Sequence, residues 1–133
     1  MVTLRCYLFA DGGDAILEWY TGCPGDVRGA MTAILEALQA IPRARWRRRR
    51  FAMLGRRGQI ECKGLGEIRI ELIGVHYRIF GFFSADERTF TMLLAFEKDR
   101  DPTYRMVCKM AQKRKTEVEN DTSRAHDCQF PPN

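Results

Sequence analysis

The sequence lacks the residue patterns that build metal centres and disulfide frameworks. It has two histidines and five cysteines, and the cysteines are odd in number, far apart and without a CxxC pair. A zinc site needs ligands at short regular spacing, and a secreted disulfide domain usually has an even cysteine count. We therefore expect no metal and no cofactor. Most cysteines should be small buried residues in a reducing cytoplasm, with Cys128 exposed in a polar segment.

Long apolar runs are missing as well. No stretch of eighteen uncharged apolar residues occurs, and the first residues lack a basic region followed by an apolar run. The first absence argues against a membrane-spanning helix, and the second argues against a signal peptide. We therefore expect a soluble, cytoplasmic protein without a membrane partner.

Length and composition fit one domain. The chain has 133 residues, of which 45% are hydrophobic, so it can bury a single core and is too apolar to be disordered throughout. The end of the chain differs, because residues 120–133 are polar and include Pro131 and Pro132. The sequence predicts a single domain over residues 1–119 and a flexible tail over residues 120–133.

Basic residues are concentrated in one block. Between Arg43 and Lys63 the local charge balance is +8, whereas the whole chain carries +5, so the remainder is about −3. Such a block is typical of a patch for nucleic acid, an acidic membrane surface or an acidic protein, although a solvated loop has the same composition. The candidate nucleic-acid contacts are Arg45, Arg47, Arg48, Arg49, Arg50, Arg56, Arg57 and Lys63.

Hydrophobic periodicity indicates an α+β fold. Apolar residues recur at helical spacing after Asp14 and after Asp26, each of which is a suitable helix cap, and a last helix is expected from Asp101 and Pro102. Strands are expected at residues 2–9, 51–54, 67–72, 75–83 and 89–96. We predict an antiparallel sheet of about four strands with two N-terminal helices and one C-terminal helix.

The two central strands form a predicted hairpin with an unusual pair of charges. A two-residue loop at Ile73 and Gly74 would set Arg69 directly against Arg78. Like charges opposite each other destabilise a sheet unless an anion or neighbouring carboxylates compensate them. A phosphate fits, because guanidinium groups bind its oxygens in pairs. The alternative is an ordinary sheet face of mixed charge.

Three segments together resemble a known family. They are KGLGEIRIEL at 63–72, HYRIFGFF at 76–83 and LLAFEKDRDPTY at 93–104. In order and spacing they are similar to the RelE/HigB toxin superfamily, in particular its phage-related HigB-like branch. There a Gly-Leu-x-Glu-Leu-Arg strand precedes Tyr-Arg-Ile/Val and then a Phe-x-Lys-Lys segment that leads into a helix beginning with proline. The resemblance covers roughly residues 1–119.

The resemblance implies a RelE/ParE-like fold and the toxin of a type II toxin-antitoxin pair. Such toxins are metal-independent endoribonucleases that cleave mRNA, typically on the ribosome, by attack of a 2′-hydroxyl on the neighbouring phosphate. The implied partners are mRNA, ribosomal RNA and a cognate antitoxin, expected to be a helix-turn-helix protein in a hetero-oligomer with the toxin.

The resemblance also assigns roles to individual residues. Arg78 would hold the scissile phosphate, with Glu67 as a candidate base and Arg69 as a second phosphate contact. Further along the chain the candidates are Lys98, with Arg100 close behind, as stabilisers or proton donors, and Tyr104 as a stacking residue.

Other interpretations stay open. Asp99 stands where the family commonly has a second lysine, and Asp101 adds another negative charge. Both favour a non-catalytic binding module of the same fold, either a ParE-like gyrase inhibitor or a phage-derived accessory protein. Glu67 could equally be a salt-bridge partner of Arg69, and His76 could carry protons or be structural.

Overall fold

The computed structural model describes residues 1–99 and 104–130. The strands are β1 Thr3–Tyr7, β2 Phe51–Met53, β3 Gly66–Leu72, β4 Val75–Phe83, β5 Thr89–Glu97 and β6 Ala125–Asp127. The helices are α1 Ala15–Thr21, α2 Gly25–Gln39 and α3 Tyr104–Asn120, with short 3₁₀ turns η1 Arg43–Arg45, η2 Ile60–Cys62 and η3 Thr122–Arg124. The predicted helix start at Asp101 and Pro102 lies outside the described residues.

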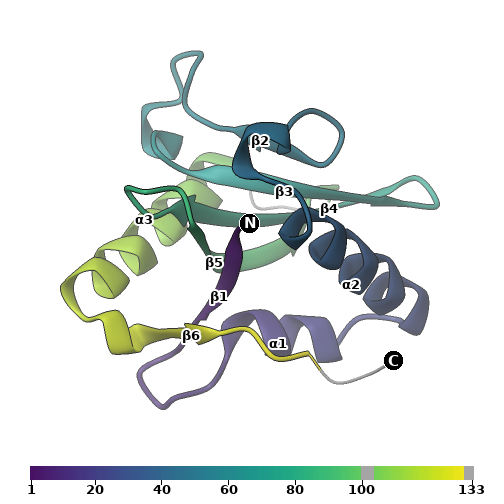
Figure 1. Ribbon diagram of the computed structural model, residues 1–133, viewed down its shortest axis with the longest axis horizontal. Coiled ribbons are helices and arrows are strands. Elements are labelled where there is room, and N and C mark those ends of the chain that lie inside the picture. Colours follow the sequence, from purple (N-terminus) through teal and green to yellow (C-terminus); the bar gives the residue numbers. More distant parts are fainter. Residues whose placement is uncertain (100–103, 131–133) are drawn as a thin grey trace.

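The strands form one mixed sheet in the order β2-β3-β4-β5-β1-β6 (Figure 1). β1 pairs with β5 in parallel, and the other neighbours are antiparallel. The α+β class is therefore confirmed. The prediction of about four antiparallel strands is wrong, because α1 and α2 separate β1 from the central strands and return the chain so that β1 and β5 run in the same direction.

The central hairpin has the predicted register. Leu72 pairs with Val75, and Arg69 pairs with Arg78. The two turn residues, Ile73 and Gly74, have φ of 50° and 74°. Two positive φ values are typical of the tight turns that match the twist of a two-residue hairpin.

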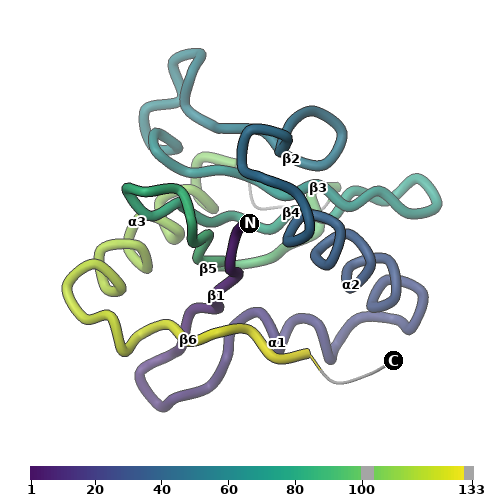
Figure 2. The backbone as a smooth tube through the Cα atoms, in the orientation of Figure 1, coloured from purple at the N-terminus to yellow at the C-terminus, as the bar shows by residue number. Residues whose placement is uncertain are grey.

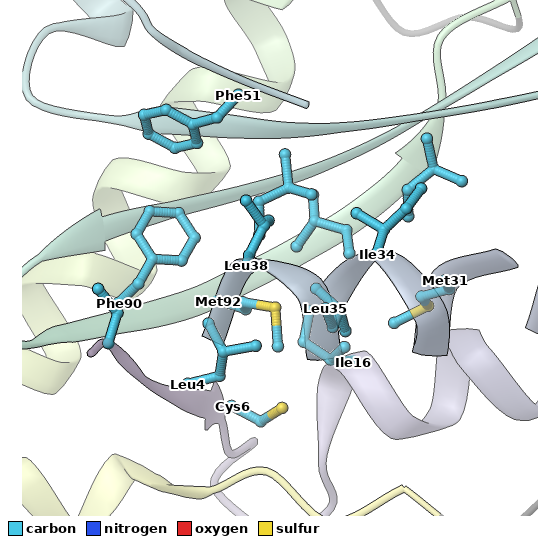
Figure 3. Packing of buried hydrophobic residues seen from close by; sticks show 14 of the residues in the cluster. Leu4, Cys6, Ile16, Met31, Ile34, Leu35, Leu38, Phe51, Phe90 and Met92 are labelled. Carbon is cyan, nitrogen blue, oxygen red and sulfur yellow. The ribbon is translucent and has the colours of Figure 1, made fainter. Parts of the chain in front are cut away.

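Both faces of the sheet are covered. On one face α1 and α2 pack against the strands, and the apolar stripe of α2 (Met31, Ile34, Leu35 and Leu38) meets Met92 of β5 and other residues of the main core (Figure 3). On the opposite face α3 packs on a second cluster that includes buried side chains of β4 and β5. The expected polar face of the hairpin is therefore partly closed by α3.

The helix starts follow the predicted chemistry in one case and differ in the other. Asp14 caps α1, because its side chain accepts hydrogen bonds from the backbone of Ile16 and Leu17. α2 begins two residues earlier than predicted, with Pro24 at the cap position, and Asp26 accepts from the backbone of Val27 within its first turn.

The segment after α3 is ordered by pairing with β1, in contrast to the predicted flexible tail. Arg5 pairs with Asp127 and Tyr7 with Ala125, so β6 runs beside β1 (Figure 2). Beyond β6, the ring centroid of Phe130 lies 5.1 Å from that of Tyr20. Buried or partly buried apolar residues within this polar segment supply the contacts that hold it.

Disulfide bonds correct the prediction of unpaired cysteines. Cys6 is bonded to Cys128, and Cys62 is bonded to Cys108, which leaves Cys23 as the free cysteine of the five. The partners are 122 and 46 residues apart in the sequence, so local spacing contains no sign of the pairing. Within the described part of the chain, none of the helices combines the length and the apolar character needed to cross a bilayer.

Candidate nucleic-acid interface and active site

An open cavity of about 1070 Å³ lies beside β2 and β3, and basic side chains dominate its lining. Glu67 and Tyr104 also face it. The basic residues that line it are Arg43, Arg47, Arg48, Arg49, Arg56, Arg57, Arg69 and Lys98. The cavity thus brings much of the arginine-rich block together with four of the six residues that the sequence suggested for catalysis.

The short edge strand β2 explains why these segments meet. β2 pairs with β3 over Phe51 to Met53, so the chain before it and the chain after it both border the same edge of the sheet (Figure 2). Before β2, the backbone of Phe51 donates to the carbonyl of Arg47, and Arg49 has a φ of 76°. This turn gathers the side chains of Arg47, Arg48 and Arg49 on the cavity.

The segment 54–65 forms the other rim and is anchored to α3. Cys62 is bonded to Cys108, and Gln112 Nε2 donates to the carbonyl of Lys63 at 2.7 Å. Gly55 has a φ of 80°, and a Cβ at this position would lie 2.5 Å from the Cα of Lys63. A side chain at residue 55 would therefore disturb the turn that carries Arg56 and Arg57.

A buried carboxylate lies between the two facing arginines. Glu67 is 2% exposed, and its Oε1 lies 2.7 Å from Nε of Arg69 and 3.7 Å from Nε of Arg78. Glu71 adds a second contact at 3.2 Å from Nη2 of Arg78. The like charges are thus compensated by the carboxylates of β3, one of the two solutions that the sequence allowed.

Oε2 of Glu67 has no hydrogen-bond partner among the described residues, although it is buried. Buried carboxylate oxygens in proteins normally accept at least one hydrogen bond. Glu67 also lines the cavity, so the unpaired oxygen belongs to a residue that borders the space where a ligand would enter.

Tyr104 joins the start of α3 to this group. Its hydroxyl accepts a hydrogen bond from Nε of Arg78 at 3.2 Å, and Nζ of Lys98 lies 6.0 Å from the centre of its ring. Burial, and secondarily the adjacent Glu67 carboxylate, raises the pKa of Tyr104 to about 12, although Arg78 opposes the shift. The phenol is therefore protonated at neutral pH and remains a hydrogen-bond donor.

Asp99 is bound to His76. Its Oδ2 accepts from the backbone N–H of His76 at 2.9 Å, and its Oδ1 lies 3.1 Å from the ring Nδ1. These hydrogen bonds, the backbone one first, lower the pKa of Asp99. The other ring nitrogen of His76 lies 2.9 Å from Glu71. Asp99 does not line the cavity, although it directly follows the lining residue Lys98.

The remaining predicted site residues lie elsewhere. Arg78 is 4% exposed and does not line the cavity. Arg45, Arg50 and Lys63 are exposed but are not part of the lining, and Arg100 lies outside the described residues. No group of three histidine, cysteine or acidic side chains suited to a metal ion occurs in residues 1–99 and 104–130.

Two polar residues of the lining, Arg43 and Gln59, were not among the predicted site residues. Arg43 lies over the ring of Phe83, with its guanidinium carbon 4.4 Å from the ring centroid, and forms an ion pair with Glu87 at 3.1 Å. Gln59 also lines the cavity. Arg43 begins the basic block and could have been included on that ground, whereas nothing in the sequence distinguishes Gln59.

The molecule is thus a small α+β protein with an arginine-lined cavity at one edge of its sheet. Residues 18–116 match the model of the family described as phage derived protein Gp49-like, and the chain belongs to this family. The match extends from α1 into α3 and includes every residue that lines the cavity. Neither the curated proteins nor the solved structures contained a significant match to the chain.

Proposed function

We propose that this protein is the toxin of a type II toxin-antitoxin pair and acts in the cytoplasm as a metal-independent endoribonuclease on mRNA, on the ribosome. The observation that supports this most is the cavity itself. Glu67, Arg69, Lys98 and Tyr104 line it together with the arginines on both sides of β2. Glu67, Arg69, Lys98 and Tyr104 belong to the segments that resemble the RelE/HigB toxins.

The arginine-rich rim supplies affinity for RNA. Arg47, Arg48 and Arg49 on one side and Arg56 and Arg57 on the other can each neutralise a phosphate. Phosphate neutralisation releases condensed counterions, so binding should weaken steeply as salt is added. This contribution is independent of base sequence, as expected for a surface that also contacts ribosomal RNA.

The chemistry follows from three side chains. Glu67 Oε2 accepts the proton of the 2′-hydroxyl, whose oxygen then attacks the adjacent phosphorus. The bond from phosphorus to the 5′ oxygen breaks, which leaves a 2′,3′-cyclic phosphate and a 5′-hydroxyl. Arg69 stabilises the charge on the phosphate oxygens, and Tyr104 donates a proton to the leaving oxygen.

Lys98 and Arg78 have different parts in this proposal. Lys98 is exposed beside the ring of Tyr104 and adds positive charge at the cavity. Arg78 is buried and donates to Tyr104 while it faces Glu67, so it positions the acid and the base relative to each other. This role replaces the direct phosphate contact suggested by the resemblance.

The test is cleavage of mRNA in a translating extract, with the RNA ends mapped after the purified protein is added. We expect cyclic-phosphate ends from the wild type and a loss of at least two orders of magnitude in rate for Glu67→Gln and Arg69→Ala. Arg88→Gln is the matched control, because Arg88 is an exposed arginine that directly precedes β5 and is not part of the cavity lining. If the wild-type protein leaves the mRNA uncleaved, the proposal that it is an endoribonuclease is overturned.

A second candidate is a binding module without catalysis, either ParE-like or phage-derived. It is favoured by the ion pairs themselves, because Glu67 and Glu71 already neutralise Arg69 and Arg78. In that case the arginine-lined cavity binds a partner, and we expect Glu67→Gln to change stability without abolishing any inhibition of growth that expression of the protein causes. Inhibition of gyrase supercoiling in the absence of RNA cleavage would support this candidate.

In either case we propose a cognate antitoxin, a helix-turn-helix protein that forms a hetero-oligomer with this chain. An antitoxin that covers the arginine-lined cavity needs acidic groups to match it. Co-expression with a small helix-turn-helix protein encoded directly beside this chain, if there is one, followed by measurement of the mass of the complex, would test this proposal.

A further inference from the structure

A row of basic residues runs along the outward side of α3. Arg105, Lys109 and Lys113 are spaced four residues apart, so they follow one another on the same side of the helix. All three are exposed. Successive members rise by about 6 Å, and the row spans about 12 Å along the axis.

The row begins where the cavity ends. Arg105 directly follows Tyr104, which lines the cavity. The Nε of Arg105 also forms an ion pair with Glu61 at 3.0 Å, in the segment that carries the rim residues Arg56 and Arg57. The first member of the row is thus one residue from a side chain that lines the cavity, and it contacts the segment that carries two of the rim arginines.

The charges of the row are available to a ligand. Of the carboxylates in the described residues, none forms an ion pair with Lys109 or Lys113, and the side chain of Arg105 is 68% exposed despite its contact with Glu61. The exposed methionines of the same helix, Met106 and Met110, line a separate hollow of about 350 Å³ together with Trp19 and other apolar residues. The row is thus a cationic surface distinct from that apolar hollow.

We propose that this row is a second contact surface for single-stranded RNA, which extends the path of the backbone from the cavity along α3. The inference rests on the RNA-binding part of the proposed function. A strand with flexible backbone can place successive phosphates against cations that repeat along a helix, and proteins that hold single strands commonly use such positively charged tracks. Exposed lysines in a row contact phosphates without reading bases.

The test compares two lengths of RNA. Fluorescence anisotropy would measure binding of 2′-O-methyl oligouridylates of about four and about twelve nucleotides, which lack the attacking hydroxyl and so stay intact. For Lys109→Gln with Lys113→Gln, we expect roughly tenfold weaker binding of the long probe and unchanged binding of the short one. The slope of log affinity against log salt for the long probe should fall by about 1.4.

Two control proteins separate the outcomes. Arg28→Gln with Arg88→Gln removes the same charge from α2 and from the β4–β5 turn, and it should bind both probes like the wild type. Arg56→Gln with Arg57→Gln alters the cavity and should weaken both probes. Thermal unfolding of each variant checks that the fold is retained.

The proposal is overturned if the α3 variant binds the long probe as tightly as the wild type, or if it loses equal affinity for both lengths. If the α3 variant binds the long probe like the wild type while the cavity variant binds it weakly, the proposed RNA-binding function stands. Only the role of the row on α3 is then removed. If the wild type binds neither probe, both proposals fail together.

Discussion

Arg69 and Arg78 face each other across β3 and β4, and both guanidinium groups lie beside one oxygen of Glu67. The arrangement makes Glu67 the compensating charge for two cations, one of them buried. Removing one partner of a buried ion pair leaves an uncompensated charge, which is more costly than the net contribution of the intact pair.

We therefore expect Glu67→Gln to destabilise the fold by roughly 2–4 kcal/mol in denaturant unfolding. Glu67→Gln combined with Arg69→Met should recover part of this loss, because the double variant removes one of the two cations. A double variant that is less stable than the sum of its single changes would contradict the view of Glu67 as a shared counter-charge.

The turn between β3 and β4 offers a stabilising substitution. Ile73 is β-branched, is 85% exposed and has a φ of 50°, a conformation that such residues rarely adopt. Asparagine adopts it readily, so Ile73→Asn should raise the free energy of unfolding by about 1 kcal/mol. Gly74→Ala is the opposite change and should lower it, since Gly74 has a φ of 74°. Both are measured by thermal unfolding, and a loss of stability in Ile73→Asn would refute the argument.

The bond between Cys62 and Cys108 fixes a rim of the cavity. Replacing both cysteines with serine should lower stability by roughly 2–4 kcal/mol, because the bond closes a chain segment with a sequence separation of 46. Cys23→Ser is the control, since Cys23 is free. Unfolding is followed with and without a reductant, and the difference between the wild type and the double serine variant should shrink once the bonds are reduced.

The raised pKa of Tyr104 has a consequence at high pH. The folded state holds the phenolic proton up to about pH 12, whereas in the unfolded chain the phenol has the ordinary pKa of 10.0. The stability gained from the protonated phenol is complete below pH 10.0 and is lost as the pH rises to about 12. Tyr104→Phe should therefore show a shallower loss of stability over this range than the wild type, as measured by denaturant unfolding at several pH values. Equal slopes would contradict the shift.

Local signals in the sequence were sufficient for several elements. The alternation on both sides of Gly74 predicted the hairpin and its register, and Asp14 predicted the start of α1. Each of these depends on residues close together in the chain. The parallel pairing of β1 with β5 and the pairing of β6 with β1 depend on contacts between distant residues, which local periodicity does not encode.

The candidate site could likewise be predicted where it depends on local sequence signals, and not where it depends on contacts between distant residues. The carboxylate and the cations of the hairpin were visible as a charge pattern, and the arginine-rich block was visible as composition. That both line one cavity depends on β2, whose three residues attach the block to the edge of β3. The burial of Arg78 was not foreseen, because it results from α3 closing a face that the alternation alone marked as polar.

The anchoring of residues 54–65 to α3 also affects how fast a ligand can be captured. The rim is covalently tied to a helix, and its backbone carbonyls accept hydrogen bonds from Gln112, so bonds within the protein hold it in place. Little conformational entropy then remains to be lost on association. The encounter rate should follow long-range attraction between the arginines and the incoming anion, without a slow step of loop closure.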